Sequence, residues 1–193
     1  LAHSFLSPLS NHRNDAYGGD LAGRMRFTLE TAEKVRAAWP DNKPLFVRIS
    51  AVDADGSDEG WQLDDSVALA GELKARGVDV VDCSSGGISG LATAAMGPRE
   101  QGFRGAYGSR IRDETGVSSM VVGLVLDADI AEELVASGAA DLVAVGREVL
   151  YNPHWPHHMA HELGADPEYA EWPEQYGWWL VRREPLLQAI RDD

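Results

Sequence analysis

Ala140-Asp141-Leu142-Val143-Ala144-Val145-Gly146-Arg147-Glu148 is the stretch that decides how this chain folds. Residues 142–145 form a short apolar run with the length and branching of a strand that is buried on both faces. The run ends at Gly146, which lets a ligand approach the backbone, and Arg147 follows with a planar fork of donors. The first amides of a turn at Arg147 would point toward the same anion. The stretch therefore predicts a strand that ends at a phosphate site; the alternative is an ordinary strand end beside a salt-bridged surface arginine.

Helical and strand patterns alternate upstream of this stretch. Residues 4–19 are rich in Ser, Asn, Asp, Gly and Pro and are predicted to form a loop. The predicted helices are 21–39, 64–76, 109–114 and 128–137, and the predicted strands are 45–50, 78–82, 118–125 and 142–145. Alternation of this kind indicates an α/β fold in which right-handed crossovers join the strands of a parallel sheet.

Candidate binding residues lie where these strands end. Arg48 places a charge in the strand 45–50, and we favour a site residue over a core ion pair because arginines are seldom fully buried without a partner. Small residues at 83–87 and Gly123 in the strand 118–125 allow close approach of a ligand. Ligands of parallel sheets collect at the carboxyl ends of the strands. The residues expected at that edge are Arg48, Ser84, Ser85, Gly123, Gly146 and Arg147.

Charge and cysteine content limit the partners and the compartment. Seventeen basic and 31 acidic residues give the 193-residue chain a formal net charge of −14. That charge repels nucleic acid and anionic membrane surfaces, so we expect neither as a partner, and an anionic cofactor needs a local basic pocket. Cys83 is the only cysteine, which excludes an internal disulfide and favours a reducing compartment. No apolar run approaches the roughly 18 residues of a membrane span, and we expect a cytoplasmic protein.

The last forty residues combine histidines with tryptophans. His157 and His161 share one face of a predicted helix, but no further ligands are spaced to complete a metal site, so we expect an exposed helix and no metal. Trp172, Trp178 and Trp179 lie within eight residues of one another. Such side chains pack either on the barrel of their own chain or on another subunit.

Several motifs, in order, closely resemble the Old Yellow Enzyme family, above all its bacterial thermophilic-like ene-reductases and xenobiotic reductases. The match runs from Leu1 to about Asn152 and more weakly through the tail. The motifs are Phe5-Leu6-Ser7-Pro8-Leu9-Ser10-Asn11-His12-Arg13-Asn14-Asp15-Ala16-Tyr17-Gly18-Gly19, Arg24-Met25-Arg26-Phe27, Leu45-Phe46-Val47-Arg48-Ile49-Ser50, Asp82-Cys83-Ser84-Ser85-Gly86 and Val145-Gly146-Arg147-Glu148.

The resemblance implies one half of a larger fold. Members are FMN-containing (β/α)8 barrels, a fold of about 250 residues, and this chain resembles strands five to eight with their helices, plus a tail. We therefore expect residues 1–152 to form the second half of a flavin-binding barrel and residues 153–193 to form a C-terminal helix and tryptophan-rich tail. The family's substrate-gripping pair and its proton-donating tyrosine would lie upstream of Leu1, so the chain alone is expected to hold an incomplete active site.

Individual residues take roles from the resemblance. Arg48 resembles the arginine beside the flavin N1 and O2, and Gly123, Gly146 and Arg147 match the FMN phosphate site. Ser84 matches a position beside the flavin. Trp179 would lie near the active-site mouth of an adjacent barrel and line its substrate. Two departures are Ala22-Gly23, where the family has Glu-Asn, and Arg104, where it commonly has glutamine; the second would alter substrate contacts.

The function expected from the resemblance is FMN-dependent ene reduction, in which NADPH or NADH reduces the flavin and an enone-type substrate is then reduced. Two alternatives stay open: a phosphate-binding barrel enzyme without flavin, and a non-catalytic half-barrel that acts as an assembly partner. Half a barrel leaves two open sheet edges and an inner face that Phe46, Ile49, Val80 and Val121 would partly line. We expect a complementary N-terminal half-barrel to cover them, rather than a second copy of this chain, and the complete barrel to form homo-oligomers.

Overall fold

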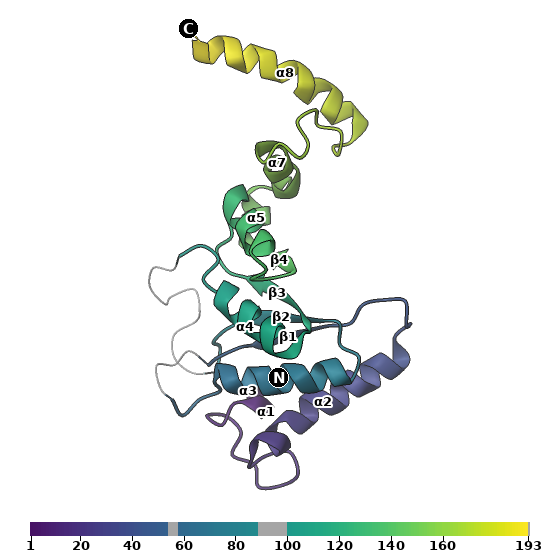
Figure 1. Ribbon diagram of the computed structural model, residues 1–193, viewed down its shortest axis with the longest axis vertical. Helices are drawn as coiled ribbons and strands as arrows, with labels where there is room; N and C mark the ends of the chain where they lie inside the picture. Colours follow the sequence, from purple (N-terminus) through teal and green to yellow (C-terminus); the bar gives the residue numbers. More distant parts are fainter. Residues whose placement is uncertain (54–57, 89–99, 193) are drawn as a thin grey trace.

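A parallel sheet flanked by helices forms the centre of the molecule. The computed structural model describes residues 1–53, 58–88 and 100–192 (Figure 1). Within them, the strands β1 (Phe46–Ser50), β2 (Val80–Ser84), β3 (Ser118–Val122) and β4 (Leu142–Ala144) pair in the order β1-β2-β3-β4, all parallel. The connections contain α3 (Leu63–Ala75), α4 (Gly105–Thr115) and α5 (Ala128–Ala136), and α2 (Leu21–Ala38) precedes β1. The chain is α/β, with the strand and helix order of half a (β/α)8 barrel, as the sequence predicts.

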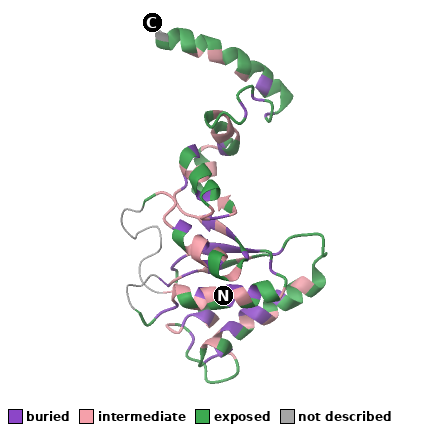
Figure 2. Ribbon diagram, in the orientation of Figure 1, coloured by how far each residue is buried: buried purple, intermediate pink, exposed green. Residues whose placement is uncertain are grey.

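The two faces of the sheet differ in what covers them. Ile49, Cys83 and Val121 lie side by side in register and are buried against the helices. On the opposite face Phe46 and Leu142 are each 42% exposed. Figure 2 shows exposed stretches beside the buried ones in this part of the molecule. The expectation that Ile49 and Val121 line the inner face is therefore wrong. Successive residues of a strand point to opposite faces, and the side chains of Ile49 and Val121 both point to the face that the helices cover. Phe46 and Val80, which pair in register, do share the other face.

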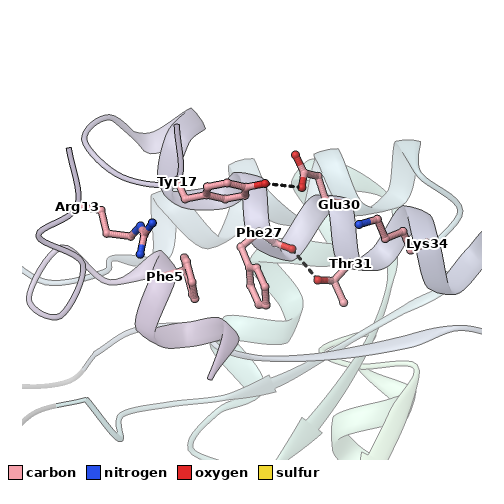
Figure 3. A pocket seen from close by; sticks show the side chains of 7 residues that line it. All are labelled: Phe5, Arg13, Tyr17, Phe27, Glu30, Thr31 and Lys34. Carbon is pink, nitrogen blue, oxygen red and sulfur yellow. Dashed lines mark hydrogen bonds between the residues drawn. The ribbon is translucent and has the colours of Figure 1, made fainter. Parts of the chain in front are cut away.

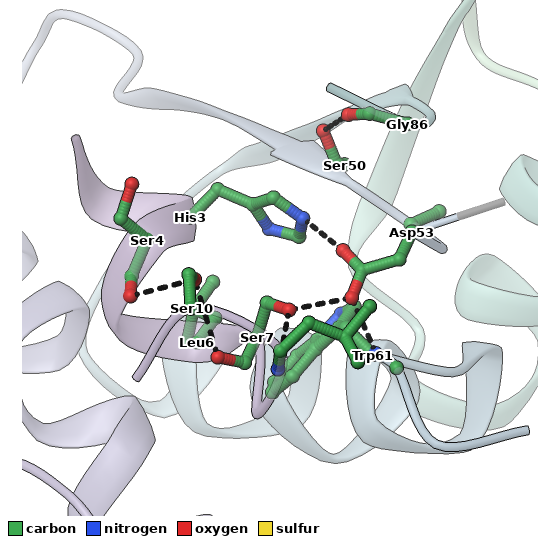
Figure 4. Close-up of polar contacts among 12 residues, drawn as sticks. His3, Ser4, Leu6, Ser7, Ser10, Ser50, Asp53, Trp61 and Gly86 are labelled. Carbon is green, nitrogen blue, oxygen red and sulfur yellow. Dashed lines mark hydrogen bonds and ion pairs between the residues drawn. The ribbon is translucent and has the colours of Figure 1, made fainter. Parts of the chain in front are cut away.

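The N-terminal segment is tied to the loop that follows β1. Residues 4–19 were expected to form a loop, but the chain begins with the short helix α1 (Ala2–Leu6). His3 Nε2 donates to Asp53 Oδ1 (2.6 Å), Ser7 Oγ donates to Asp53 Oδ2, and the Trp61 backbone N–H donates to the same oxygen (2.7 Å) (Figure 4). These long-range hydrogen bonds, which local sequence does not reveal, fix α1 in place.

Helix α4 begins earlier than the sequence suggests. It starts at Gly105 rather than at Ser109. A Cβ on Gly108 would lie 2.5 Å from Val121 Cγ1, and one on Gly105 would lie 2.8 Å from Leu134 Cδ2. The two glycines therefore serve close packing of the helix against β3 and α5, although in the sequence they resemble loop residues. The long loop predicted before this helix lies largely outside the described residues.

The C-terminal part consists of α6 (Arg147–Tyr151), α7 (Trp155–Glu162) and α8 (Glu174–Asp192). In Figure 1, α8 extends away from the sheet, and Trp178 and Trp179 on it are 50% and 68% exposed. Trp172, by contrast, is buried, and its ring lies 4.9 Å from the His157 ring. Trp172 thus docks on the tail itself, whereas the boundary at residue 152 stays a prediction. No helix in the described ranges is long and apolar enough to cross a membrane.

Candidate phosphate-binding site

A hollow lies at the carboxyl ends of β3 and β4. Its volume is about 390 Å³, within the range of small-molecule sites. It is lined by Arg104, Val122, Gly123, Leu124, Val125, Leu126, Ala144, Val145, Gly146, Arg147 and Glu148. The structure thus brings Gly123, Gly146 and Arg147 together, as predicted, and adds a second arginine that sequence reasoning assigned to substrate contacts.

The two glycines serve different purposes. Nothing lies within 4 Å of the place where a Gly146 Cβ would stand, so this backbone is open to the hollow. Gly123 has φ +151°, and a Cβ there would lie 2.7 Å from Phe103 Cε1 and 3.0 Å from an Arg104 guanidinium nitrogen. Gly123 follows β3, which ends at Val122, instead of lying inside the strand as predicted. Its missing side chain makes room for Phe103 and Arg104, and Gly146 alone leaves open space for a ligand.

Arg147 supplies an exposed cation at the mouth of the hollow. It is the first residue of α6, directly after Gly146. Because α6 has only five residues, its dipole contributes little, and the positive charge comes from side chains. Among the described residues that line the hollow, Arg147 and Arg104 carry positive charge and Glu148 carries negative charge.

Arg104 is held deep beside the same hollow. Its side chain is buried, and the residue is only 6% exposed. Its Nε donates to Ser85 Oγ (2.9 Å), a terminal nitrogen donates to the Val122 carbonyl oxygen (2.8 Å), and the guanidinium lies 4.4 Å from the Phe103 ring centre. In the sequence, Arg104 is an isolated arginine between Gly102 and Gly105. This local pattern does not distinguish a buried arginine from one in a surface loop.

Arg48 and Ser84 lie on the helix-free face of the sheet and do not line this hollow. Arg48 stands in register with Asp82, and its Nε donates to Asp82 Oδ2 (2.6 Å). The Asp82 side chain is 6% exposed and the Arg48 side chain is 58% exposed. Arg48 therefore forms an ion pair with a largely exposed side chain, not an ion pair in the core, and its place in a binding site stays a prediction. Ser84 follows Asp82 by two residues and shares that face.

Cys83 lies between Asp82 and Ser84 in β2, and its side chain points to the opposite face, toward the helices. Burial, and then the charge of Asp82, raise the pKa of the Cys83 thiol to about 12. The thiolate is the reactive form of cysteine, so this thiol is inert at neutral pH. Cys83 is a small residue of the hydrophobic core.

A second hollow, of about 330 Å³, lies at the N-terminal segment and α2 (Figure 3). It is lined by Phe5, Arg13, Tyr17, Phe27, Glu30, Thr31 and Lys34. The rings of Phe5 and Phe27 stack with centres 4.3 Å apart, and Tyr17 donates its hydroxyl to Glu30 (3.1 Å), which raises the pKa of Tyr17. None of the residues predicted for function lies here.

The remaining candidates lie in the tail. Trp179 on α8 does not line the hollow, and its place beside an adjacent barrel stays a prediction. His161 Nδ1 lies 3.0 Å from the Asp166 carbonyl oxygen, and its Nε2 lies 3.0 Å from the Tyr169 hydroxyl. Within the described ranges, no three His, Cys, Asp or Glu side chains are grouped so that they could hold a metal ion.

Known proteins share both the sequence and the fold. A sequence model of the NADH:flavin oxidoreductase / NADH oxidase family matches residues 1–166. The NADPH dehydrogenase of Bacillus subtilis (strain 168) is 39% identical over 166 residues, which cover 86% of this chain and 47% of that protein. The NADPH dehydrogenase of Geobacillus thermodenitrificans (strain NG80-2) is 42% identical over 180 residues, which cover 92% and 50%. The chain thus spans about half the length of the curated relatives it matches.

Solved structures give the same result for the fold. Morphinone reductase superposes with a TM-score of 0.64 at 26% identity, over 85% of this chain and 41% of that one. The old yellow enzyme homologue from Zymomonas mobilis superposes with a TM-score of 0.63 at 22% identity, over 84% and 43%. Because the family match covers most of the chain and the half-barrel superposes on these enzymes, the chain belongs to the NADH:flavin oxidoreductase / NADH oxidase family, and its resemblance to the Old Yellow Enzymes is confirmed.

Proposed function

We propose that this chain forms the phosphate-binding half of an FMN-dependent NAD(P)H oxidoreductase that reduces activated C=C bonds of α,β-unsaturated carbonyl or related compounds. The observation that carries the proposal is the convergence of Gly123, Gly146 and Arg147 on one hollow at the carboxyl ends of β3 and β4. Relatives at about 40% identity are named NADPH dehydrogenases, so we take NADPH as the reductant to test first, with NADH beside it.

The residues at the hollow fit a phosphate monoester. The open space at Gly146 lets a phosphate oxygen approach the backbone, and Arg147 offers a planar set of donors that matches phosphate geometry. When bound, FMN would supply a ring that accepts hydride from a nicotinamide and delivers it to an alkene. Gly146 and Arg147 would fix the phosphate end and so orient the cofactor.

Arg48 would supply positive charge toward the reacting part of the cofactor, as the resemblance implies. Its bond to the buried Asp82 fixes the direction of the guanidinium, while the exposed side chain stays available on the helix-free face. A fixed cation placed where negative charge develops is an effective way to favour reduction. Ser84, on the same face, would contact the flavin.

The helix-free face and the outer edges of β1 and β4 need a partner. Parallel sheets are covered on both faces in stable proteins, and this sheet exposes Phe46 and Leu142. We propose that a complementary N-terminal half, either a separate chain or a segment of the same protein, completes the barrel and brings the substrate-binding pair and the proton donor. The complete barrels would form homo-oligomers through the tail, with Trp179 facing an adjacent barrel. The single cysteine favours a reducing compartment, and we propose the cytoplasm.

The test measures FMN binding and turnover by the complete protein, meaning this chain together with the half that completes its barrel. Arg147→Ala is expected to weaken FMN binding by more than about tenfold, or ~1.4 kcal/mol, in a fluorescence titration of the apoprotein. The matched control is Arg110→Ala, an arginine of α4 that pairs with Asp64 and Glu114. Unchanged FMN affinity in Arg147→Ala would refute the site. Phosphate binding without flavin colour would favour a flavin-free barrel, and the absence of any turnover would favour an assembly partner.

A further inference from the structure

Trp172 is the buried side chain that packs the tail just before α8. The residue is 8% exposed and lies two positions before Glu174, the first residue of α8. Its indole Nε1 is buried and has no hydrogen-bond partner among the described residues. The indole is therefore held by the packing of the rings that surround it, and not by a hydrogen bond.

Three histidines at the start of α7 surround this indole, and we call them the histidine clamp: His154, His157 and His158. Their ring centres lie 4.9, 4.9 and 5.2 Å from the ring centre of Trp172. Helix α7 is itself anchored, because the buried Trp155 donates its Nε1 hydrogen to the Leu126 carbonyl oxygen (2.8 Å). The clamp is thus the contact through which an anchored helix holds Trp172 and, with it, the start of α8.

The clamp is open to protons and favours neutral rings. His154 and His158 are exposed, so protons reach them from water. The ring centres of His154 and His157 lie 6.3 Å apart, a distance at which two imidazolium charges repel each other. Partial burial lowers the pKa of the His158 imidazole, and so do the neighbouring positive charges, in order of effect His154, His157, Arg183 and His161.

The carboxylates in the same part of the tail are engaged elsewhere. Asp166 accepts two backbone N–H groups (2.6 and 3.2 Å), and Glu184 accepts the Tyr169 hydroxyl (2.7 Å) and lies 3.3 Å from an Arg183 guanidinium nitrogen. Within the described ranges, no ion pair joins either carboxylate to the clamp. One charged imidazole gains from contact with the face of the indole, but a second and a third charge repel the first without a counter-ion.

We propose that the histidine clamp makes the docking of Trp172 dependent on pH: neutral rings hold the indole and the start of α8, and the gain of a second and a third positive charge releases them. Because docking favours neutral rings, it is strongest above the ordinary histidine pKa of about 6.5 and weakens as the pH falls below that value. Helix α8 carries the exposed Trp178 and Trp179, so release of α8 would also move these side chains. The inference uses no property of the flavin and stands or falls independently of the proposed function.

Amide hydrogen exchange of the complete protein tests the clamp, with rates at about pH 7.5 and about pH 5.5 corrected for the intrinsic pH dependence of exchange. At about pH 5.5 roughly nine in ten ordinary histidines are charged, so each ring that docking keeps neutral should speed exchange in residues 166–180 by up to about tenfold. Peptides from β1, β2 and β3 should show no such change. The matched control is His12→Phe, which replaces an exposed histidine of the N-terminal segment and should behave as the wild type does.

Variants of the clamp separate its role from general packing. Replacing all three histidines, His154→Phe/His157→Phe/His158→Phe, keeps rings around Trp172 and should abolish the pH dependence. If that variant does not fold, His158→Phe alone should reduce the pH dependence, and Trp172→Ala should give fast exchange in residues 166–180 at both pH values. Unchanged or slower exchange of that segment at about pH 5.5, equal acceleration in the sheet, or full pH dependence in the histidine variants would each overturn the inference.

Discussion

Replacing Asp53 with alanine should lower the free energy of unfolding by about 3–5 kcal/mol. Asp53 accepts hydrogen bonds from the His3 ring, the Ser7 hydroxyl and the Trp61 backbone N–H, and its own side chain is fully buried (Figure 4). Ser7 and Trp61 are likewise buried and would be left without an acceptor, at about 1–3 kcal/mol each. His3, whose side chain is 16% exposed, can turn partly toward water and costs less.

The assay is urea denaturation of the complete protein, in which the midpoint shifts while the slope stays unchanged. Asp41→Ala is the matched control, because Asp41 is an exposed aspartate in the turn before β1. Ser7→Ala removes one donor and leaves Asp53 satisfied by the other two, so it should cost only about 1 kcal/mol. If Asp53→Ala destabilises the protein no more than Asp41→Ala does, the reasoning that Asp53 anchors the N-terminal segment is refuted.

Three further predictions follow from charge and burial. Arg48→Met should lower the flavin reduction potential and slow reduction by nicotinamide more than it weakens FMN binding, because the cation matters most once the flavin is anionic; an unaltered potential in spectroelectrochemistry would contradict this. Cys83 should resist disulfide reagents in the native protein and react only on unfolding, since its pKa is about 12; rapid native labelling would contradict it. Burial and the hydrogen bond to Glu184 raise the pKa of Tyr169 to about 12, above its unfolded value. The contribution of Tyr169 to the free energy of unfolding is therefore fully present below pH 10 and is lost as the pH rises toward 12. Thermal melts should show this loss of stability in the wild type and not in Tyr169→Phe.

The residues of the hollow differ in how much of their placement is encoded in local sequence. Gly146 and Arg147 could be predicted because a buried run, a glycine and an arginine follow one another directly in the chain. Arg104 could not be assigned to the hollow in this way. The position of its guanidinium depends on Ser85, nineteen residues before it, and on Val122, eighteen residues after it. Only folding brings the oxygens of these two residues within hydrogen-bond distance.

The sequence by itself determined the alternation of helices and strands from α2 to β4 and the parallel sheet. These features follow from periodicity and from capping between neighbours, such as the Gly23 N–H that donates to Asp20 (2.8 Å). Tertiary structure alone decided that Gly105 begins a helix, that α1 forms at all, and which face of the sheet each strand residue takes. Packing against β3 and α5, the hydrogen bonds to Asp53 and the register of paired strands are contacts between distant residues, and local periodicity carries no record of them.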